Sequence, residues 1–267
     1  MTEIMRYQKP SDILLASSAY QQADEPRYLA GGMTLLPTIR QRLAAPDRLI
    51  DLADCNLASI TSDEHNLTLG AMSTHHSVAT SHIVQDCLPA LAMLASGIGD
   101  RQVRVRGTCG GSLANNDPAA CYPAALLALD GTIITDKREI AASDYFVDLF
   151  ETALDEGEII TAIRLPLPLM AAYSKAPNPA SRYALVGSFV ARTKDEVRVA
   201  ITGAGEQGVF RWTAAEAALS HDFSKASLDD ISISPEGLMG DIHASPDFRA
   251  HMIKTMTQRA ISLTKAQ

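Results

Sequence analysis

Two short stretches of the 267-residue sequence are rich in glycine and small polar residues, a composition suited to binding phosphate. Residues 98–118 form the more informative stretch. Its glycines are Gly107, Gly110 and Gly111, and its basic residues are Arg101, Arg104 and Arg106. Residues 28–37 have the same character around Gly31 and Gly32. Because glycine has no Cβ atom, main-chain N–H groups in both stretches can approach an anion, and we expect the two to hold one nucleotide cofactor between them.

The alternative to phosphate binding is a purely structural one. An isolated Gly-Gly turn is most often only a tight connection, because glycine readily adopts positive φ. This sequence has two such stretches, each followed by a helix-compatible run, and one of them is flanked by arginines. Phosphate binding and a purely structural turn are therefore about equally well supported. Neither stretch is a Gly-x-Gly-x-x-Gly after a strand, and no Gly-x4-Gly-Lys-Ser/Thr occurs. The sequence therefore predicts neither a Rossmann dinucleotide site nor a P-loop.

Other polar residues near the glycines have competing interpretations. The adjacent His75 and His76 do not predict a metal site, because neighbours on an extended segment point to opposite sides and no third ligand has suitable spacing. They fit better as polar donors beside a cofactor. Cys109 is either a reactive thiol or, more commonly, a small buried residue in a tight turn. Asp117 is either a turn-forming acid or an acceptor for a ribityl or ribose hydroxyl. Ser112 lacks the Gly-x-Ser-x-Gly context, so no catalytic triad is predicted.

Composition limits the class of protein. A hydrophobic content of 46% allows a substantial core, with room for two domains or one large domain and an appendage. A formal net charge of -8 argues against a dedicated nucleic-acid binder. The four cysteines include no Cys-x-x-Cys pair, so no local iron–sulfur or zinc motif is present. We find no membrane span and no signal peptide, and expect a reduced, cytoplasmic setting.

The elements that must position these residues follow from periodicity and turn signals. We expect a βαβ-like unit, with a helix over 35–43 that Thr34 can cap. Beyond it we expect a hairpin over 60–71, a loop over 72–76, helical segments over 78–94 and 122–129, and strands over 132–135 and 158–165.

Four prolines between residues 166 and 179 mark the expected domain boundary. After it we predict strands over 183–191 and 196–203, then a helix opened by a capping box at Thr213 and Glu216. A terminal helix begins at Ser245-Pro246-Asp247. The carboxyl-terminal part is expected to be an α+β layer that closes over the glycine stretches.

The two glycine stretches also resemble those of a known family. Residues 30–37 (Ala-Gly-Gly-Met-Thr-Leu-Leu-Pro) and 106–114 (Arg-Gly-Thr-Cys-Gly-Gly-Ser-Leu-Ala) are similar to the first and second FAD-binding motifs of the FAD-binding medium subunit of molybdenum hydroxylases. That family includes xanthine dehydrogenases, carbon monoxide dehydrogenase and aldehyde or N-heterocycle hydroxylases. The similarity continues through residues 70–76, 173–175 and 244–251 and covers nearly the whole chain.

The resemblance implies a fold and a set of cofactor-binding residues. The fold is α+β, with a two-subdomain vanillyl-alcohol-oxidase (PCMH)-type FAD-binding domain over residues 1–167 and a smaller domain of the carbon monoxide dehydrogenase flavoprotein type over 168–267. The implied FAD-binding residues are Ala30, Gly31, Gly32, Met33, Thr34, Leu35, Thr74, His75, His76, Thr108, Cys109, Gly110, Gly111, Ser112, Asp117, Cys121, Ile160 and Lys175. No catalytic side chain and no metal ligand is implied. Cys121 departs from the family pattern, which commonly has an aspartate there, and so removes or replaces a hydrogen bond to FAD.

The implied function is electron transfer within a larger complex. Electrons would come from a molybdenum cofactor on a large subunit and [2Fe–2S] clusters on a small subunit, and would leave through FAD to NAD, oxygen or a quinone. The resemblance further implies a dimer of heterotrimers, with neither nucleic acid nor a membrane span. One alternative is an assembly subunit that retains the fold without flavin. Another is a stand-alone oxidase of the vanillyl-alcohol type, although the chain lacks the large substrate domain of such enzymes.

Overall fold

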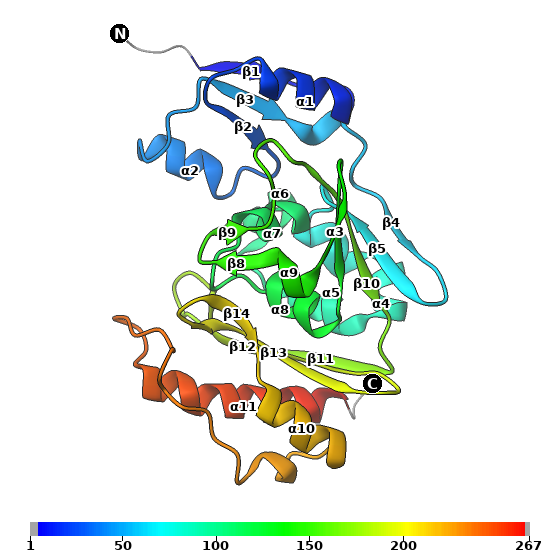
Figure 1. The fold of residues 1–267 in the computed structure, drawn as a ribbon, viewed down its shortest axis with the longest axis vertical. Helices are drawn as coiled ribbons and strands as arrows, with labels where there is room; N and C mark the ends of the chain where they lie inside the picture. Colours follow the sequence, from blue (N-terminus) through cyan, green and yellow to red (C-terminus); the bar gives the residue numbers. More distant parts are fainter. Residues whose placement is uncertain (1–4, 265–267) are drawn as a thin grey trace.

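The computed structural model describes residues 5–264, whose elements form three parts stacked along the long axis (Figure 1). The first part comprises β1 (Arg6–Gln8), α1 (Ile13–Gln21), β2 (Pro26–Leu29), α2 (Leu35–Arg40), β3 (Arg48–Asp51) and the 3₁₀ helix η1 (Leu52–Asp54). Its strands form a parallel sheet in the order β1-β3-β2, so the predicted βαβ unit is confirmed. The Asp12 side chain caps α1 by accepting a hydrogen bond from the N–H of Leu15.

The second part is built on an antiparallel sheet in the order β4-β5-β10-β6-β7. Its strands are β4 (Ile60–Ser62), β5 (Asn66–Gly70), β6 (Thr132–Thr135), β7 (Glu139–Ala141) and β10 (Ile160–Pro166). Around it lie α3 (His75–Thr80), α4 (His82–Cys87), α5 (Pro89–Ser96), α6 (Arg101–Arg106), α7 (Cys109–Asn115), α8 (Tyr122–Ala128), α9 (Ala142–Tyr145) and a ribbon of β8 (Phe146–Asp148) and β9 (Glu151–Thr152). Alternate residues of β5 and β10, such as Leu67, Leu69 and Ile163, are buried in a core shared with these helices.

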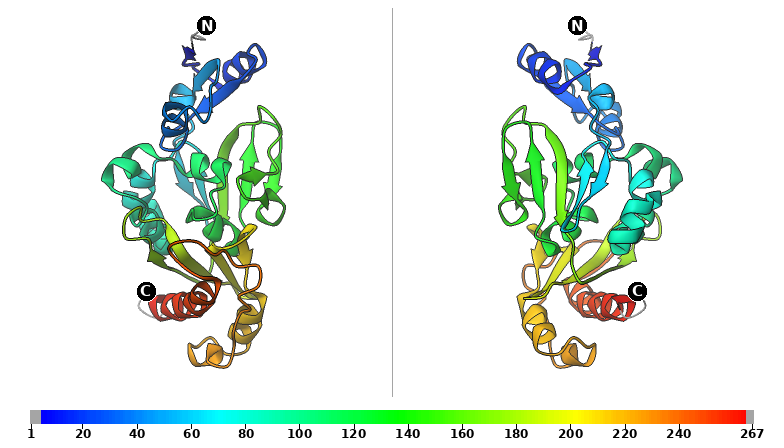
Figure 2. Two further views of the ribbon diagram at one scale, coloured as in Figure 1. Left: turned by 90° about the vertical axis from the view of Figure 1, so that its left-hand side faces the viewer. Right: turned by 90° about the vertical axis from the view of Figure 1, so that its right-hand side faces the viewer.

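The third part is a four-stranded antiparallel sheet in the order β11-β12-β13-β14. Its elements are β11 (Met170–Pro177), β12 (Ala184–Arg192), β13 (Val197–Gly205), β14 (Gly208–Arg211), α10 (Thr213–His221), the 3₁₀ helix η2 (Ala226–Leu228) and α11 (Pro246–Thr264). Helix α11 covers the sheet face that points away from the second part, as the side views show (Figure 2). Phe189 packs in the core of the second part while Val190 packs with α11, so β12 is apolar on both faces.

Two local predictions are wrong because side-chain caps start three helices there. Residues 72–76 were expected to be a loop, but Thr74 accepts a hydrogen bond from the N–H of Ser77, and α3 therefore begins at His75. The second glycine stretch was expected to present its main chain to an anion, with no helix predicted within it. It contains α6 and α7, which are capped by Asp100 and Thr108.

Two expected caps are absent. Thr34 makes no side-chain capping bond to α2. Thr213 is the first residue of α10 rather than its cap, and the Glu216 carboxylate instead accepts hydrogen bonds from the Val199 N–H and from Arg211. The proline-rich segment 166–179 contains β11, an edge strand, where proline is tolerated because one side of the strand is unpaired.

Candidate functional site

A cavity of about 730 Å³ lies where the three parts meet. The first part contributes residues that include Tyr28, Ala30–Leu35 and Thr38. The second contributes His75, residues of α6 and α7, and Glu158–Ile160, and the third contributes Lys175 and 181–183. All the predicted cofactor-binding residues except Thr74, His76 and Cys109 line this cavity. Segments far apart in the sequence therefore form one site.

The first glycine loop, residues 30–35, offers free main-chain donors to the cavity. Its N–H groups from Gly31 to Leu35 have no hydrogen-bond acceptor among residues 5–264. Gly32 has a φ of +73°, a conformation that favours glycine, and this turn directs the chain from β2 into α2. Consecutive unpaired N–H groups at a turn form a concave anion-binding surface. This loop therefore fits a diphosphate.

The second glycine motif has a different role from the predicted one. The N–H groups of Cys109, Gly110, Gly111 and Ser112 are donated to Ser73 O, Ala71 O, Thr108 Oγ1 and Thr108 O, at 2.9–3.1 Å. They are therefore not available to an anion. The glycines here permit close packing instead, because a Cβ atom on Gly110 would lie 2.6 Å from the Cβ of Ala71. The motif forms a wall of the cavity, and its free polar group there is the Ser112 hydroxyl, which has no partner among the described residues.

His75 lies in the cavity wall and is 5% exposed. Burial, and to a smaller extent the charge of Arg104, lowers its pKa to about 4, so the imidazole is neutral at pH 7. Its Nδ1 atom has no hydrogen-bond partner among residues 5–264. The ring also packs closely on the second motif, since a Cβ atom on Gly107 would lie 2.7 Å from Nε2 of His75. Nδ1 is itself inaccessible, so His75 contributes a neutral ring to the cavity wall rather than an open hydrogen-bonding atom.

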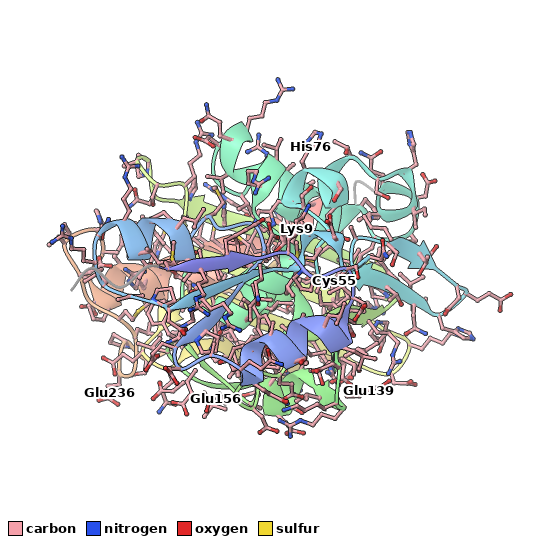
Figure 3. The ribbon with its side chains drawn as sticks, turned by 90° about the horizontal axis from the view of Figure 1, so that it is seen from above. Lys9, Cys55, His76, Glu139, Glu156 and Glu236 are labelled. Atoms are coloured by element: carbon pink, nitrogen blue, oxygen red, sulfur yellow. The ribbon has the colours of Figure 1, made fainter. Side chains whose placement is uncertain are left out.

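The other predicted residues of this region lie outside the cavity. His76 is exposed and lies at the periphery of the molecule seen from above (Figure 3). Thr74 is occupied in capping α3. Cys109 is completely buried, its Sγ lies 3.4 Å from the carbonyl oxygen of Gly70, and burial raises its pKa to about 12. The alternative of a small buried cysteine is therefore the correct one, and a reactive thiol at Cys109 is excluded.

Asp117 forms a turn, which was one of its two predicted roles, and the other, as an acceptor for a ribityl or ribose hydroxyl, stays a prediction. Its Oδ1 accepts a hydrogen bond from the N–H of Ala119 at 2.8 Å, as in a turn, and its side chain also lines the cavity. Burial raises its pKa. Asn115 lies beside it in the cavity wall, so this side of the cavity offers hydrogen-bond acceptors and donors for hydroxyl groups.

Lys175 connects the third part to the cavity wall. Its Nζ donates hydrogen bonds to the carbonyl oxygens of Gly97 at 2.8 Å and Arg182 at 2.9 Å, and lies 3.5 Å from Sγ of Cys121. Cys121 therefore faces an ammonium group where an aspartate was expected from the family pattern. The contact between Lys175 and Cys121 keeps a polar interaction at residue 121, although no second carboxylate lies beside Asp117.

Glu158 was not predicted, although it is a buried acid at the start of a strand. Burial acts to raise its pKa, but hydrogen bonds from Arg138, the Asp155 N–H and Thr135 outweigh burial and lower it to about 2. This network fixes the chain just before Ile160, where the pairing of β10 with β6 contains a bulge. Bulges re-aim side chains next to sites, and Ile160 lines the cavity here. The sequence signal that could have identified Glu158 is the Gly-Glu pair directly before an apolar strand.

The lining residues Arg182 and Tyr183 were also missed, because only the fold brings their exposed loop to the glycine motifs. No group of three or more His, Cys, Asp or Glu side chains suited to a metal ion occurs within residues 5–264. Across that same range, no helix has both the length and the apolar character needed to cross a membrane.

Comparison with known proteins gives consistent matches. The family model for the FAD binding domain in molybdopterin dehydrogenase matches residues 3–168. The chain is 29% identical to the carbon monoxide dehydrogenase medium chain of Afipia carboxidovorans, over 98% of this chain and 96% of that one. It is 32% identical to the nicotine 6-hydroxylase medium subunit of Paenarthrobacter nicotinovorans, over 96% of both chains. The structure of quinoline 2-oxidoreductase from Pseudomonas putida 86 matches with a TM-score of 0.88 at 26% identity, covering 100% of this chain and 98% of that chain.

Proposed function

The chain belongs to the family of FAD-binding domains in molybdopterin dehydrogenases, and we propose that it is the FAD-carrying electron-transfer subunit of a heteromeric molybdenum hydroxylase. When bound, FAD supplies the redox chemistry, taking up electrons from a molybdenum cofactor and [2Fe–2S] clusters on partner subunits and delivering them to an external acceptor. The residues of this chain bind and orient the cofactor. They contribute no catalytic acid or base.

The single observation that carries the proposal is the row of N–H groups from Gly31 to Leu35 at the cavity, which have no acceptor in the described part of the chain. A diphosphate accepts several such donors at once, so this loop can bind it without a charged side chain. The second glycine motif supports this loop from behind. Gly31 allows the two to approach, because it has no Cβ atom to occupy the contact with the backbone of Arg106 and Gly107.

The remaining residues of the cavity wall can contact the other two parts of FAD, which are its sugar hydroxyl groups and its rings. The Asp117 carboxyl and the Ser112 hydroxyl are suited to hydroxyl groups of the ribityl or ribose units. His75, Ile160 and Lys175 lie on other stretches of the wall, where polar groups and an apolar side chain can contact the edge and face of a ring. Each of these predicted residues in the cavity wall therefore has a proposed role in binding FAD.

The larger organisation is part of the same proposal. We assign residues 1–167 to the PCMH-type FAD-binding domain and 168–267 to the smaller domain of the carbon monoxide dehydrogenase flavoprotein type. Support comes from the family match, which ends at residue 168, and from the separate sheet that starts at Met170. The partners are a large molybdenum-cofactor subunit and a small [2Fe–2S] subunit, in a dimer of heterotrimers in the cytoplasm. NAD, oxygen or a quinone accepts the electrons.

The test is the flavin content of the complex purified through its partner subunits. We expect an oxidised-flavin absorption spectrum that bleaches with dithionite, with FAD equimolar to this chain. Replacing both Gly110 and Gly111 by valine should remove the flavin, because Gly110 has no room for a side chain against Ala71. A folded, colourless complex that takes up no added FAD would instead support a flavin-free assembly subunit.

A further inference from the structure

The segment Pro118–Ala120 connects two cavity residues, Asp117 and Cys121, and is held from the third part of the molecule. The Gly203 N–H donates to the carbonyl oxygen of Pro118 at 2.8 Å, and the Ala184 N–H donates to that of Ala119 at 3.3 Å. The Thr202 hydroxyl lies 2.6 Å from the carbonyl oxygen of Ala120 and 3.0 Å from that of Pro118. The three carbonyl groups of the segment are thus all bound by the sheet of the third part.

Within this set of hydrogen bonds, the Thr202 hydroxyl is the donor to the Ala120 carbonyl. A hydroxyl group carries one proton, so it donates to one carbonyl at a time. The Gly203 N–H already serves Pro118, and the shorter distance assigns the Thr202 proton to Ala120. Thr202 is completely buried, so no water can take its place when the hydroxyl is removed. The carbonyl of Ala120, directly before Cys121, would then be left unpaired.

The strand end that presents these donors is itself fixed. Gly203 has a φ of +79°, and a Cβ atom there would lie 2.4 Å from the carbonyl oxygen of Ala184. Arg249, which is 2% exposed on α11, donates to the carbonyl oxygens of Gly203 and Leu185 and pairs with Asp241 at 2.7 Å. The donors of Thr202 and Gly203 therefore sit on a rigid support.

We infer that Thr202 is a positioning residue for FAD, acting from outside the cavity by fixing the backbone between Asp117 and Cys121. This inference rests on the proposed function. It gives the third part of the molecule an indirect share in the cofactor site, in addition to its lining residues Lys175, Arg182 and Tyr183, although the FAD-binding family model ends at residue 168. Thr202 itself does not line the cavity.

The experiment compares FAD affinity of the complex, stripped of flavin and titrated with FAD, for three variants. Thr202→Val keeps the shape of the side chain but removes the hydroxyl, and should raise the FAD dissociation constant roughly tenfold, as expected for one lost buried hydrogen bond. Thr202→Ser restores the donor and should return affinity to within about twofold of wild type. The flavin circular dichroism spectrum should change in Thr202→Val and recover in Thr202→Ser.

Thr257→Val is the matched control. Thr257 is also completely buried, and its hydroxyl bonds to Ser188 at 2.9 Å and to Ile253, away from the cavity. It should lower the melting temperature about as much as Thr202→Val while leaving FAD affinity unchanged. Equal FAD affinity in Thr202→Val and wild type, or equal losses in Thr202→Val and Thr257→Val, would overturn the inference. If the wild-type complex binds no FAD, the proposed function itself fails.

Discussion

Gly31 touches the backbone of Arg106, with a Cβ atom built on Gly31 lying only 2.1 Å from the Arg106 carbonyl oxygen. The first glycine loop thus packs directly on the second motif, 75 residues later in the sequence (106 less 31). Backbone atoms cannot move aside as a flexible side chain can. The contact sets the position of the N–H groups that follow Gly31, and with it the geometry proposed for the diphosphate.

Gly31→Ala should therefore separate the two motifs. We expect FAD affinity to fall by more than tenfold and the free energy of unfolding to drop by about 1–3 kcal/mol, the usual range for overpacking. FAD titration and thermal unfolding measure the two effects. Gly131→Ala is the control, because a Cβ atom there is overpacked as well, at 2.5 Å from Cδ1 of Leu126, but Gly131 does not line the cavity. Equal affinity in both variants would show that the contact at Gly31 does not shape the site.

The position of the site could be predicted from sequence because its glycines are local signals. Gly31 and Gly32 follow a strand and precede a helix in the sequence as in the structure. The division of labour between the motifs could not be predicted, since it depends on which N–H groups find acceptors. Those of Cys109 and Gly110 pair with Ser73 and Ala71, residues that reach them only through the fold.

The same limit explains the residues that were missed. Tyr183 and Arg182 belong to an exposed loop whose sequence has no phosphate or flavin pattern, and they reach the cavity because β11 and β12 place them there. Cys109 was misassigned to the cofactor because its position in the motif does not reveal that its side chain points into the core. Side-chain direction within α7 depends on its cap, Thr108, which was not predicted from the sequence.

Lys175→Met should weaken FAD binding through the loop that Lys175 restrains. The change removes hydrogen bonds from a charged donor to Gly97 and Arg182, each worth about 1.5–3 kcal/mol when intact. Because solvent can replace part of this, we expect roughly a tenfold rise in the FAD dissociation constant. Lys194→Met, at an exposed turn between β12 and β13, is the control and should bind FAD normally. Unchanged binding in both variants would remove Lys175 from the site.

The stability of the chain should depend on pH through His75. Its pKa is about 4 in the folded chain and 6.5 when unfolded, so between these values the unfolded state binds more protons. Stability is therefore complete above pH 6.5 and falls as the pH drops toward 4, by on the order of 3 kcal/mol at most. Glu158, with a pKa lowered from 4.5 to about 2, loses its contribution only as the pH falls below 4.5.

Melting temperatures of His75→Gln and His76→Gln between pH 4.5 and 7 test this assignment. His75→Gln should flatten the dependence because the titrating group is gone, although it lowers stability at pH 7. His76 is exposed and should leave the slope unchanged. Identical slopes for wild type and His75→Gln would show that another group controls this pH range.

Cys121 is the cysteine that lines the cavity, so FAD should protect it from alkylation. Cys121 and Cys55 are both nearly buried, with exposed fractions of 4% and 6%, but Cys55 does not line the cavity that FAD would fill. Cys109 is completely buried with a pKa near 12, and Cys87 is half-buried away from the cavity. We expect N-ethylmaleimide to label Cys121 roughly tenfold faster after FAD removal, as measured by mass spectrometry of the peptides, since thiol reactivity requires access. Cys87 is the internal reference, because its labelling should not depend on FAD. If Cys121 and Cys87 show the same ratio of rates with and without FAD, the cofactor does not cover Cys121, and the cavity wall at Lys175 lies outside the flavin site.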